Sequence, residues 1–204
     1  PGGTGLGSSS AFTSGLINLC LNFNNQKKSN YWIAEEACEI EINRLGEPIG
    51  KQDQYACSIG GLNQLIFCKN GKVKVNPIRI SPENYNALND NLYMYYTGIK
   101  RSASSILKEQ KTETTTDAKF RIMQKIVELV PLGKDYLETG ELDCFGELLH
   151  KGWELKKQMS DKISNTFIEE MYTLGMKNGA LGGKLLGAGG GGFLLFYVPK
   201  NNKN

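Results

Sequence analysis

The first ten residues, PGGTGLGSSS, contain four glycines and three serines. From about Ser9 to Phe23, apolar residues then recur at helical spacing, which predicts a helix directly after this loop. A helix N-terminus presents unpaired N–H groups and the positive end of the helix dipole, and small residues let phosphate oxygens approach the main chain. Serine hydroxyls add donors and can also hold a metal ion. The pattern therefore favours phosphate binding, and the alternative is a flexible glycine–serine linker.

Two acidic residues, Glu41 and Asp53, lie on either side of the Gly/Pro-containing segment LGEPIG. Phosphoryl transfer needs a cation that neutralises the phosphates and a group that orients or deprotonates the nucleophile. Beside a phosphate-binding loop, one acid can hold the cation and the other can face the acceptor hydroxyl. Taken alone, a solvated acid and a turn acid are the simpler interpretation. Glu39 is the neighbouring acid that could bind the cation in place of Glu41. It is two residues away, so it lies on a different face of the predicted helix.

A third stretch, LLGAGGGGF at residues 185–193, is a glycine-rich loop between two apolar segments. The simplest interpretation is a β-hairpin with a long glycine turn. Glycine also permits positive φ angles and close packing of backbone against a neighbouring loop. We expect this loop to support the site rather than to carry out chemistry.

In this order, the three stretches resemble the motifs of the GHMP kinase superfamily, which includes galactokinase, homoserine kinase, mevalonate kinase and phosphomevalonate kinase. The family pattern Pro-x-x-x-Gly-Leu-Gly-Ser-Ser-Ala matches the start of the chain, with Ser10 in place of the commoner alanine. The resemblance implies that ATP and Mg²⁺ are bound and that the glycine-rich loops wrap the nucleotide. The nucleotide-binding residues it implies are Gly3, Gly5, Leu6, Gly7, Ser8, Ser9, Ser10, Gly189 and Gly190.

The same resemblance implies roles for the two acids. Glu41 corresponds to the Mg²⁺ ligand, together with a serine of the first loop, for which we take Ser9 and leave Ser8 and Ser10 open. Asp53, which begins an Asp-Gln pair, corresponds to the catalytic aspartate near the sugar hydroxyl. Whether this aspartate acts as a base or as an orienting charge stays open.

The order of elements predicts an α+β fold, because hairpins and runs of helices replace a clean βαβ alternation. A short helix is expected after Ser81-Pro82 by the cap-then-proline rule. Segments 19–23 (LCLNF) and 93–96 (YMYY), and Trp32 and Trp153, are expected in the core. The longer helices are expected at about 9–23, 31–44, 102–110, 117–130, 145–160 and 164–178. Strands are expected at 64–68 and 72–75, which form a hairpin, at 91–96, and on both sides of the last glycine loop.

For the fold, the resemblance implies a two-domain GHMP kinase architecture. One part is similar to ribosomal protein S5 domain 2, and the C-terminal part is a ferredoxin-like α+β domain. Residues 1–80 are assigned to the remainder of the N-terminal, ATP-binding domain and residues 81–204 to the C-terminal domain.

Within the superfamily, PIGKQDQYACSIGGLNQ and LYMYYTGIKRSASSIL resemble the D-glycero-D-manno-heptose 7-phosphate kinases. The resemblance implies phosphorylation of the anomeric 1-hydroxyl to give the 1,7-bisphosphate. A substrate that already carries a phosphate needs a cation, and Lys51 and Arg101 are the candidates. Thr97 and Gly98 are assigned to the same substrate pocket.

Composition and charge exclude several other classes. The chain has 204 residues and a formal net charge of +3, with acidic and basic residues interleaved, so a nucleic-acid-binding track is not expected. The single histidine, His150, argues against a Cys/His zinc site, and the odd number of cysteines argues against a disulfide framework. No apolar run approaches the roughly 20 residues of a membrane span, so we expect a cytoplasmic protein without a membrane partner. Formation of a homodimer is left open. The five cysteines are Cys20, Cys38, Cys57, Cys68 and Cys144.

Superfamily members begin with a segment that carries a first motif, and this chain starts at the second. We therefore interpret it as part of a longer protein, expect activity only from the complete protein, and expect the first helix to lack its partner sheet. Three alternatives stay open: a kinase for an unphosphorylated sugar such as galactose or fucose, a catalytically silent sugar or nucleotide sensor with this fold, and a plain α+β interaction domain.

Overall fold

The computed structural model describes residues 5–99 and 117–202. Close contacts divide the chain into two compact units, one spanning Leu6–Pro77 and the other Ile78–Asn204, with Gly5 grouped with the second. The division falls three residues before the expected domain boundary at residue 80. The two units are described separately below.

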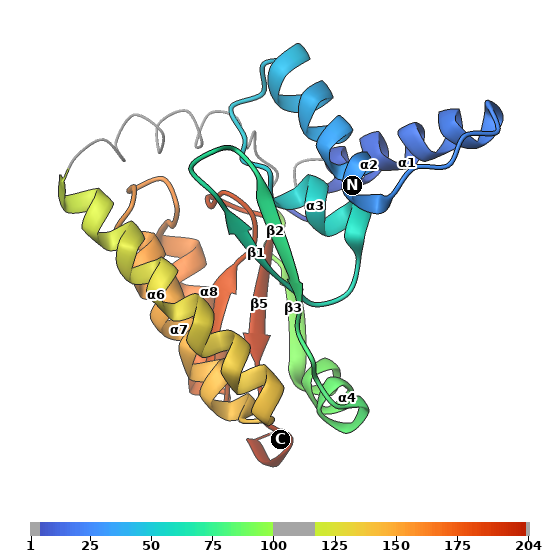
Figure 1. The fold of residues 1–204 in the computed structure, drawn as a ribbon. Helices are drawn as coiled ribbons and strands as arrows, with labels where there is room; N and C mark the ends of the chain where they lie inside the picture. Colours follow the sequence, from blue (N-terminus) through green and yellow to red (C-terminus); the bar gives the residue numbers. More distant parts are fainter. Residues whose placement is uncertain (1–4, 100–116, 203–204) are drawn as a thin grey trace. The chain divides into compact units, whose positions relative to one another are not determined.

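The first unit consists of helices followed by a hairpin (Figure 1). Its elements are α1 (Ser8–Phe23), α2 (Asn30–Cys38), the π-helix η1 (Glu39–Arg44), α3 (Gln52–Ile59) and the antiparallel strands β1 (Asn63–Phe67) and β2 (Val73–Pro77). The expected helices at 9–23 and 31–44 and the expected hairpin are present. Helix α3 was not predicted. Its eight residues lie between Gly50 and Gly60, and such closely spaced glycines are typical of loops.

Helix α2 packs on both sides and thereby organises the unit. Its N-cap, Ser29, accepts a hydrogen bond from the backbone N–H of Trp32 at 3.2 Å. Ile33 and Ala37 pack against α1, where they meet Ile17 and Leu21. The adjacent stripe, with Ala34 and Cys38, packs against α3 and the hairpin, where it meets Tyr55 and Val73.

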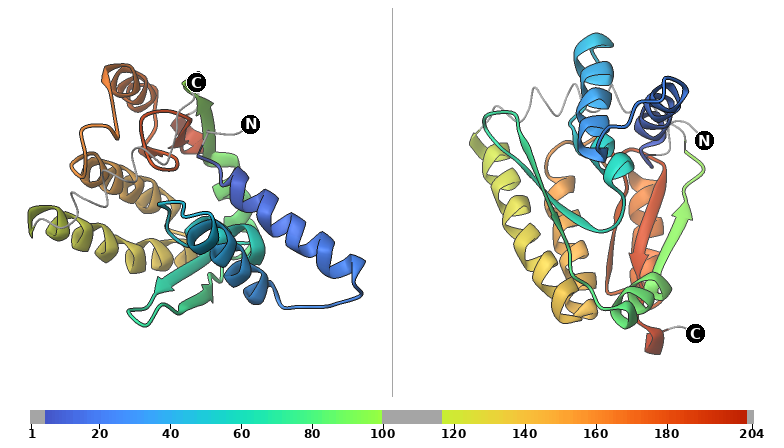
Figure 2. Two further views of the ribbon diagram at one scale, coloured as in Figure 1. Left: turned by 90° about the horizontal axis from the view of Figure 1, so that it is seen from above. Right: turned by 45° about the vertical axis from the view of Figure 1, so that its right-hand side comes forward.

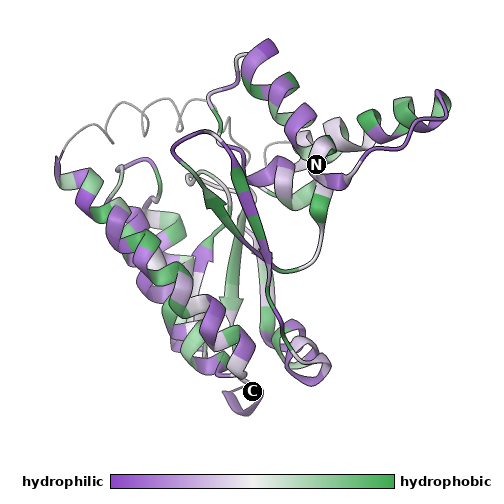
Figure 3. Cartoon of the chain, viewed as in Figure 1, coloured by the Kyte–Doolittle hydropathy of each residue, from purple (hydrophilic) through white to green (hydrophobic). Residues whose placement is uncertain are grey.

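The core expectation for α1 is wrong for most of its apolar residues. Segment 19–23 was expected inside, yet only Leu21 of its apolar side chains is buried, and Phe23 is 85% exposed. The buried stripe of α1 consists instead of Ser10, Ser14, Ile17 and Leu21. Phe12, Leu16, Leu19 and Phe23 are exposed on the other face. Figure 3 colours the ribbon by residue hydropathy, and green hydrophobic segments recur along α1. Of the two buried serines, Ser10 donates a hydrogen bond to the Glu41 carboxylate described below, and Ser14 hydrogen-bonds to Ser58.

The second unit contains a three-stranded antiparallel sheet in the order β3-β5-β4. The strands are β3 (Leu92–Tyr96), β4 (Gly182–Leu185) and β5 (Phe193–Tyr197), and the helices are α4 (Pro82–Asn91), α6 (Asp117–Thr139), α7 (Leu142–Lys157), α8 (Thr166–Lys177) and the 3₁₀ turn η2 (Lys200–Asn202). Helices α6 and α7 run side by side (Figure 2). The core includes Trp153, Ile163, Ile168, Leu185 and Leu194, so Trp153 is buried as expected. The expected helix 102–110 lies outside the described residues.

Two further expectations for this unit need correction. Helix α6 continues through Pro131 to Thr139, although the proline predicted an end at Val130. Segment 93–96 was expected in the core, but β3 is an edge strand of the described sheet and all four of its side chains, Tyr93, Met94, Tyr95 and Tyr96, are exposed. The cap-then-proline start of α4 is confirmed, since Ser81 Oγ accepts from Asn84 N at 3.2 Å.

Glycines at the junction of β4 and α7 allow backbone to pack on backbone. A Cβ built on Gly182 would overlap the carbonyl oxygen of Gly146 on α7 and lie 2.8 Å from the backbone nitrogen of His150. Neither atom can move aside without shifting the helix. The close approach of strand and helix therefore depends on glycine at this position.

We predict that Gly182→Ala in the full-length protein lowers the free energy of unfolding by about 1–3 kcal/mol, the usual effect of overpacking. Thermal or urea denaturation monitored by circular dichroism measures this change. The matched control is Gly152→Ala on α7, where the nearest atom lies 3.7 Å from the added methyl. This control is expected to stabilise the protein, because alanine favours helix over glycine by about 1 kcal/mol. Equal effects of the two substitutions would contradict the proposed packing.

Candidate active site

Glu41 is the buried centre of the first unit, with only 1% of its surface exposed. It lies in η1, where the helix widens to a π-helix and the backbone N–H of Leu45 bonds to the carbonyl of Ile40 at 2.9 Å. Short π-helical segments occur frequently at functional sites. The four donors to its carboxylate are Ser9 Oγ (2.5 Å from Oε1), Thr13 Oγ1 (3.0 Å from Oε1), Ser10 Oγ (2.8 Å from Oε2) and Gln54 Nε2, which also bonds to Oε2.

These donors keep the Glu41 carboxylate ionised. Burial by itself raises the pKa of a carboxyl group, because it disfavours the charged form. Here the hydrogen bonds from Ser9, Ser10, Gln54 and Thr13 outweigh burial, and the pKa of Glu41 is lowered. In the described part of the chain, no lysine or arginine forms an ion pair with this carboxylate. The site is therefore a buried negative charge held by neutral donors.

Asp53 lies in the first turn of α3, half-buried, beside the loop that precedes α1. A Cβ built on Gly7 would be 3.5 Å from Asp53 Cβ and 3.6 Å from Asp53 Cγ, so the carboxylate lies close to this glycine. Burial, and secondly the charge of Glu41, raise the pKa of Asp53. The pKa values of the two acids are thus shifted in opposite directions, which is the arrangement expected when neighbouring carboxylates serve as anion and base.

The loop before α1 has the backbone geometry of an anion site. Gly7 adopts a left-handed conformation (φ 66°), and no side chain caps the helix. Gly5 also has positive φ (80°), and a Cβ there would lie 2.9 Å from the carbonyl oxygen of Leu186. The first-turn N–H groups of the 16-residue helix consequently receive no side-chain cap, which is the arrangement that favours an anion at a helix start.

The carboxylate of Glu41 and the serine and threonine hydroxyl oxygens around it are ligands that suit a hard divalent cation such as Mg²⁺. Mg²⁺ in phosphoryl-transfer sites is usually held by one or two carboxylates and by substrate phosphates. Among residues 5–99 and 117–202, no cluster of three or more His, Cys, Asp or Glu side chains could form an all-protein metal cage. A carboxylate offers about four acceptor positions, and all four of Glu41 are taken. The residues fit the cation if Ser9, which is exposed, turns its hydroxyl proton away from Glu41.

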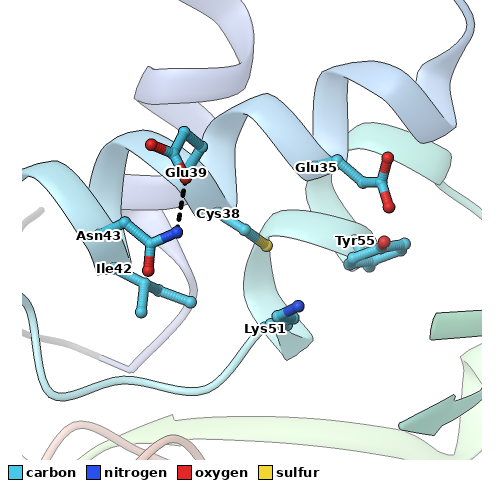
Figure 4. Close-up of a pocket in the computed structure, with 7 residues that line it drawn as sticks. All are labelled: Glu35, Cys38, Glu39, Ile42, Asn43, Lys51 and Tyr55. Carbon is cyan, nitrogen blue, oxygen red and sulfur yellow. Dashed lines mark hydrogen bonds between the residues drawn. The ribbon is translucent and has the colours of Figure 1, made fainter. Parts of the chain in front are cut away.

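Lys51 lines a cavity of about 210 Å³ within the first unit (Figure 4). Its ammonium donates to the carbonyl oxygen of Gly71 at 2.8 Å. Burial raises the pKa of the Cys38 thiol in this cavity to about 11, so it is a thiol rather than a reactive thiolate. The cavity is lined by Glu35, Cys38, Glu39, Ile42, Asn43, Lys51 and Tyr55. Arg101 and Gly3 lie outside the described residues.

In the second unit, Thr97 ties the third glycine-rich loop to the end of β3. Its buried hydroxyl donates to Gly192 O at 2.9 Å and accepts from Gly192 N at 3.1 Å. The N–H of Gly190 bonds to Ile163 O at 2.7 Å, and a Cβ on Gly189 would lie 2.6 Å from Ile163 Cα. Gly98 has a positive φ of 76° and open space around it. The loop is thus held tightly by backbone contacts that only glycine permits.

Two members of the Glu41 network, Thr13 and Gln54, were not predicted as site residues. Thr13 lies three and four residues after Ser10 and Ser9, so it shares their face of α1. That spacing was a signal in the sequence. Gln54 is the second residue of the Asp-Gln pair noted in the sequence, which was a signal. Its contact with Glu41 depends on α3, and this helix was not predicted.

Comparisons with known proteins define the class. The GHMP kinases N terminal domain matches residues 1–61, and the GHMP kinases C terminal domain matches residues 134–203. The chain belongs to the GHMP kinase family, as its motifs predicted, and the α+β fold is confirmed.

Two individual relatives and one solved structure are similar to this chain over nearly its whole length. The chain is 36% identical over 203 residues to D-glycero-alpha-D-manno-heptose 7-phosphate kinase of Campylobacter jejuni, covering 100% of this chain and 60% of the relative. It is 30% identical over 211 residues to the bifunctional fucokinase/GDP-fucose pyrophosphorylase of Arabidopsis thaliana, covering 100% of this chain and 19% of that protein. Among solved structures, a D-glycero-D-manno-heptose 1-phosphate kinase from Bacteroides thetaiotaomicron is 28% identical with a TM-score of 0.67, covering 98% of this chain and 55% of that one. The chain thus spans 60% of the length of the curated heptose kinase that it matches.

The raised pKa of Asp53 predicts a pH-dependent effect on stability. Because the folded state disfavours ionised Asp53, its pKa is higher in the folded than in the unfolded state, and ionisation lowers the free energy of unfolding. Asp53→Asn in the full-length protein should therefore raise the melting temperature at pH 7. The gain should vanish as the pH falls below the usual carboxyl value of about 3.9. Melting curves across this pH range test the prediction, with the exposed Asp161→Asn as the control that should show no gain. An Asp53→Asn variant less stable than wild type at pH 7 would contradict it.

Proposed function

We propose that the full-length protein containing this chain is an ATP-dependent sugar kinase that phosphorylates the anomeric 1-hydroxyl of D-glycero-D-manno-heptose 7-phosphate. The observation that carries the proposal is the pairing of an ionised, buried Glu41 with a half-buried Asp53 beside an uncapped helix N-terminus. The 36% identity to a heptose 7-phosphate kinase supports the choice of sugar. Phosphorylation with ATP would take place in the cytoplasm, where we expect the protein to work. No helix in the described part of the chain has the length and apolar character to cross a bilayer.

In this proposal, the N–H groups at the start of α1 bind the phosphates of ATP, and the helix dipole favours their negative charge. Glu41 and Ser9 would hold Mg²⁺, which would neutralise charge on the transferring phosphoryl group. The loop glycines Gly5 and Gly7 leave room for phosphate oxygens next to the backbone. The third glycine-rich loop, held by Thr97, supports the nucleotide through Gly189 and Gly190.

Asp53 is proposed to face the 1-hydroxyl of the sugar. Its raised pKa makes the ionised carboxylate a stronger base, suited to accept the hydroxyl proton. The hydroxyl oxygen then attacks the γ-phosphorus in line, and the bond between that phosphorus and the bridging oxygen of ADP breaks. Lys51 and Arg101 are proposed as the cations for the 7-phosphate of the substrate, with Thr97 and Gly98 contributing to the substrate pocket.

The role of Asp53 is tested by Asp53→Asn in the full-length protein. Loss of a general base typically lowers turnover by about 10²–10⁴-fold, and we expect a decrease in this range. The affinity for nucleotide should stay nearly unchanged, because Asp53 does not bind the phosphates. Steady-state ADP release measures turnover, and calorimetry measures binding. Wild-type turnover in this variant would show that Asp53 has another role.

The identity of the sugar is tested by a substrate panel containing D-glycero-D-manno-heptose 7-phosphate, the unphosphorylated heptose, galactose and fucose. We expect the highest kcat/KM for the 7-phosphate. A preference for fucose or galactose would favour the alternative, an unphosphorylated-sugar kinase, which the 30% identity to a fucokinase supports. Tight ATP binding without turnover of any sugar would indicate a silent sensor. Absence of any thermal stabilisation by ATP would indicate a plain interaction domain.

A further inference from the structure

Gln54 is completely buried on α3, and among the described residues its side chain makes one hydrogen bond, from Nε2 to Glu41 Oε2. Its orientation is fixed by chemistry, because only the amide nitrogen can donate to a carboxylate. The amide oxygen therefore points away from Glu41. In the described part of the chain this oxygen is buried and has no hydrogen-bond partner.

An unpaired buried carbonyl is unfavourable, since it loses its water partner and gains none. A methionine of similar length would fill the same space without this cost. The amide is therefore not explained by packing. The amide supplies a hydrogen-bond donor to Glu41, which an apolar side chain cannot supply.

The four donors divide between the two oxygens of the carboxylate in a way that matters for cation binding. Oε1 accepts from Ser9, which is exposed, and from Thr13. Oε2 accepts from Ser10, which is 2% exposed, and from Gln54, which is fully buried. A cation arriving from solvent thus meets the Oε1 side, where the Ser9 hydroxyl can turn away. The Oε2 side has no such freedom, because both of its donors are enclosed.

We propose that Gln54 is a positioning residue that anchors the inner oxygen of Glu41, so that the outer oxygen can exchange the Ser9 hydrogen bond for a bound Mg²⁺ without reorientation of the carboxylate. This inference rests on the proposed function, because it takes Glu41 as the cation-binding carboxylate. It assigns Gln54 no contact with nucleotide or sugar. The amide acts through Glu41, and groups that orient a metal ligand typically change metal affinity or activity by about 10–100-fold when removed.

The test compares binding of the β,γ-imido analogue of ATP to the full-length protein with Mg²⁺ and with EDTA, by calorimetry. The ratio of the two affinities is the magnesium-dependent gain. In Gln54→Met we expect this gain to fall about 10-fold, while metal-free affinity stays unchanged. The matched control is Gln52→Met, the same substitution at an exposed position of the same helix, which should leave both affinities unchanged.

A double-mutant comparison separates positioning from a structural effect. In a Glu41→Gln background, Gln54→Met should cause no further loss of the magnesium-dependent gain, because the carboxylate it orients is absent. If Gln54→Met is poorly folded by circular dichroism, Gln54→Asn replaces it, since this variant keeps the amide but withdraws the donor by one methylene.

The outcomes distinguish this inference from the proposed function. A wild-type protein whose affinity for the ATP analogue does not depend on Mg²⁺ would overturn both. A normal magnesium-dependent gain in wild type that is unchanged in folded Gln54→Met or Gln54→Asn would overturn the role of Gln54 alone. A further loss in the Glu41→Gln background would likewise overturn it, since Gln54 would then act independently of Glu41.

Discussion

The first unit is organised around one constraint, the burial of an ionised carboxylate without a paired cation among the described residues. A buried charge is tolerated only when its acceptor positions are filled. The side chain of Glu41 meets this requirement with three hydroxyls and one amide. These donors come from two separate helices, α1 and α3, and the carboxylate comes from η1. The hydrogen bonds of this carboxylate therefore join η1 to α1 and α3. All three elements must be in place to position it.

The same constraint explains why α1 presents serines rather than apolar residues to the interior. Ser10 and Ser14 are buried while Phe12 and Phe23 are exposed. Ser14 hydrogen-bonds to Ser58 of α3 at 2.9 Å, so the polar stripe continues beyond the Glu41 site. Hydrophobic contacts of α1 begin only one turn further, at Ile17 and Leu21. The N-terminal half of the helix is thus built for polar chemistry and its C-terminal half for packing.

The glycine-rich loops have different physical reasons for their composition. Gly7 combines a left-handed backbone with close approach to Asp53. Gly189 is required because Ile163 lies against it, and the loop is closed by the two hydrogen bonds between Thr97 and Gly192. The helix that follows the first loop has no side-chain cap, whereas backbone groups of the loop at 185–193 bond to Thr97, Ile99 and Ile163. Similar composition therefore meets two different structural requirements.

The sequence alone determined the family, the α+β class and most of the elements, because motifs and helical or alternating periodicity are local properties. It also indicated Glu41, Asp53 and the serine loop. It did not show α3, whose eight residues lie between glycines, or the passage of α6 through Pro131. Only the tertiary structure decided which apolar residues are buried and brought Gln54 and Thr13 to Glu41. The physical reason is that burial and hydrogen bonding join residues far apart in sequence, such as Thr13 and Glu41, whereas sequence patterns report only on neighbours.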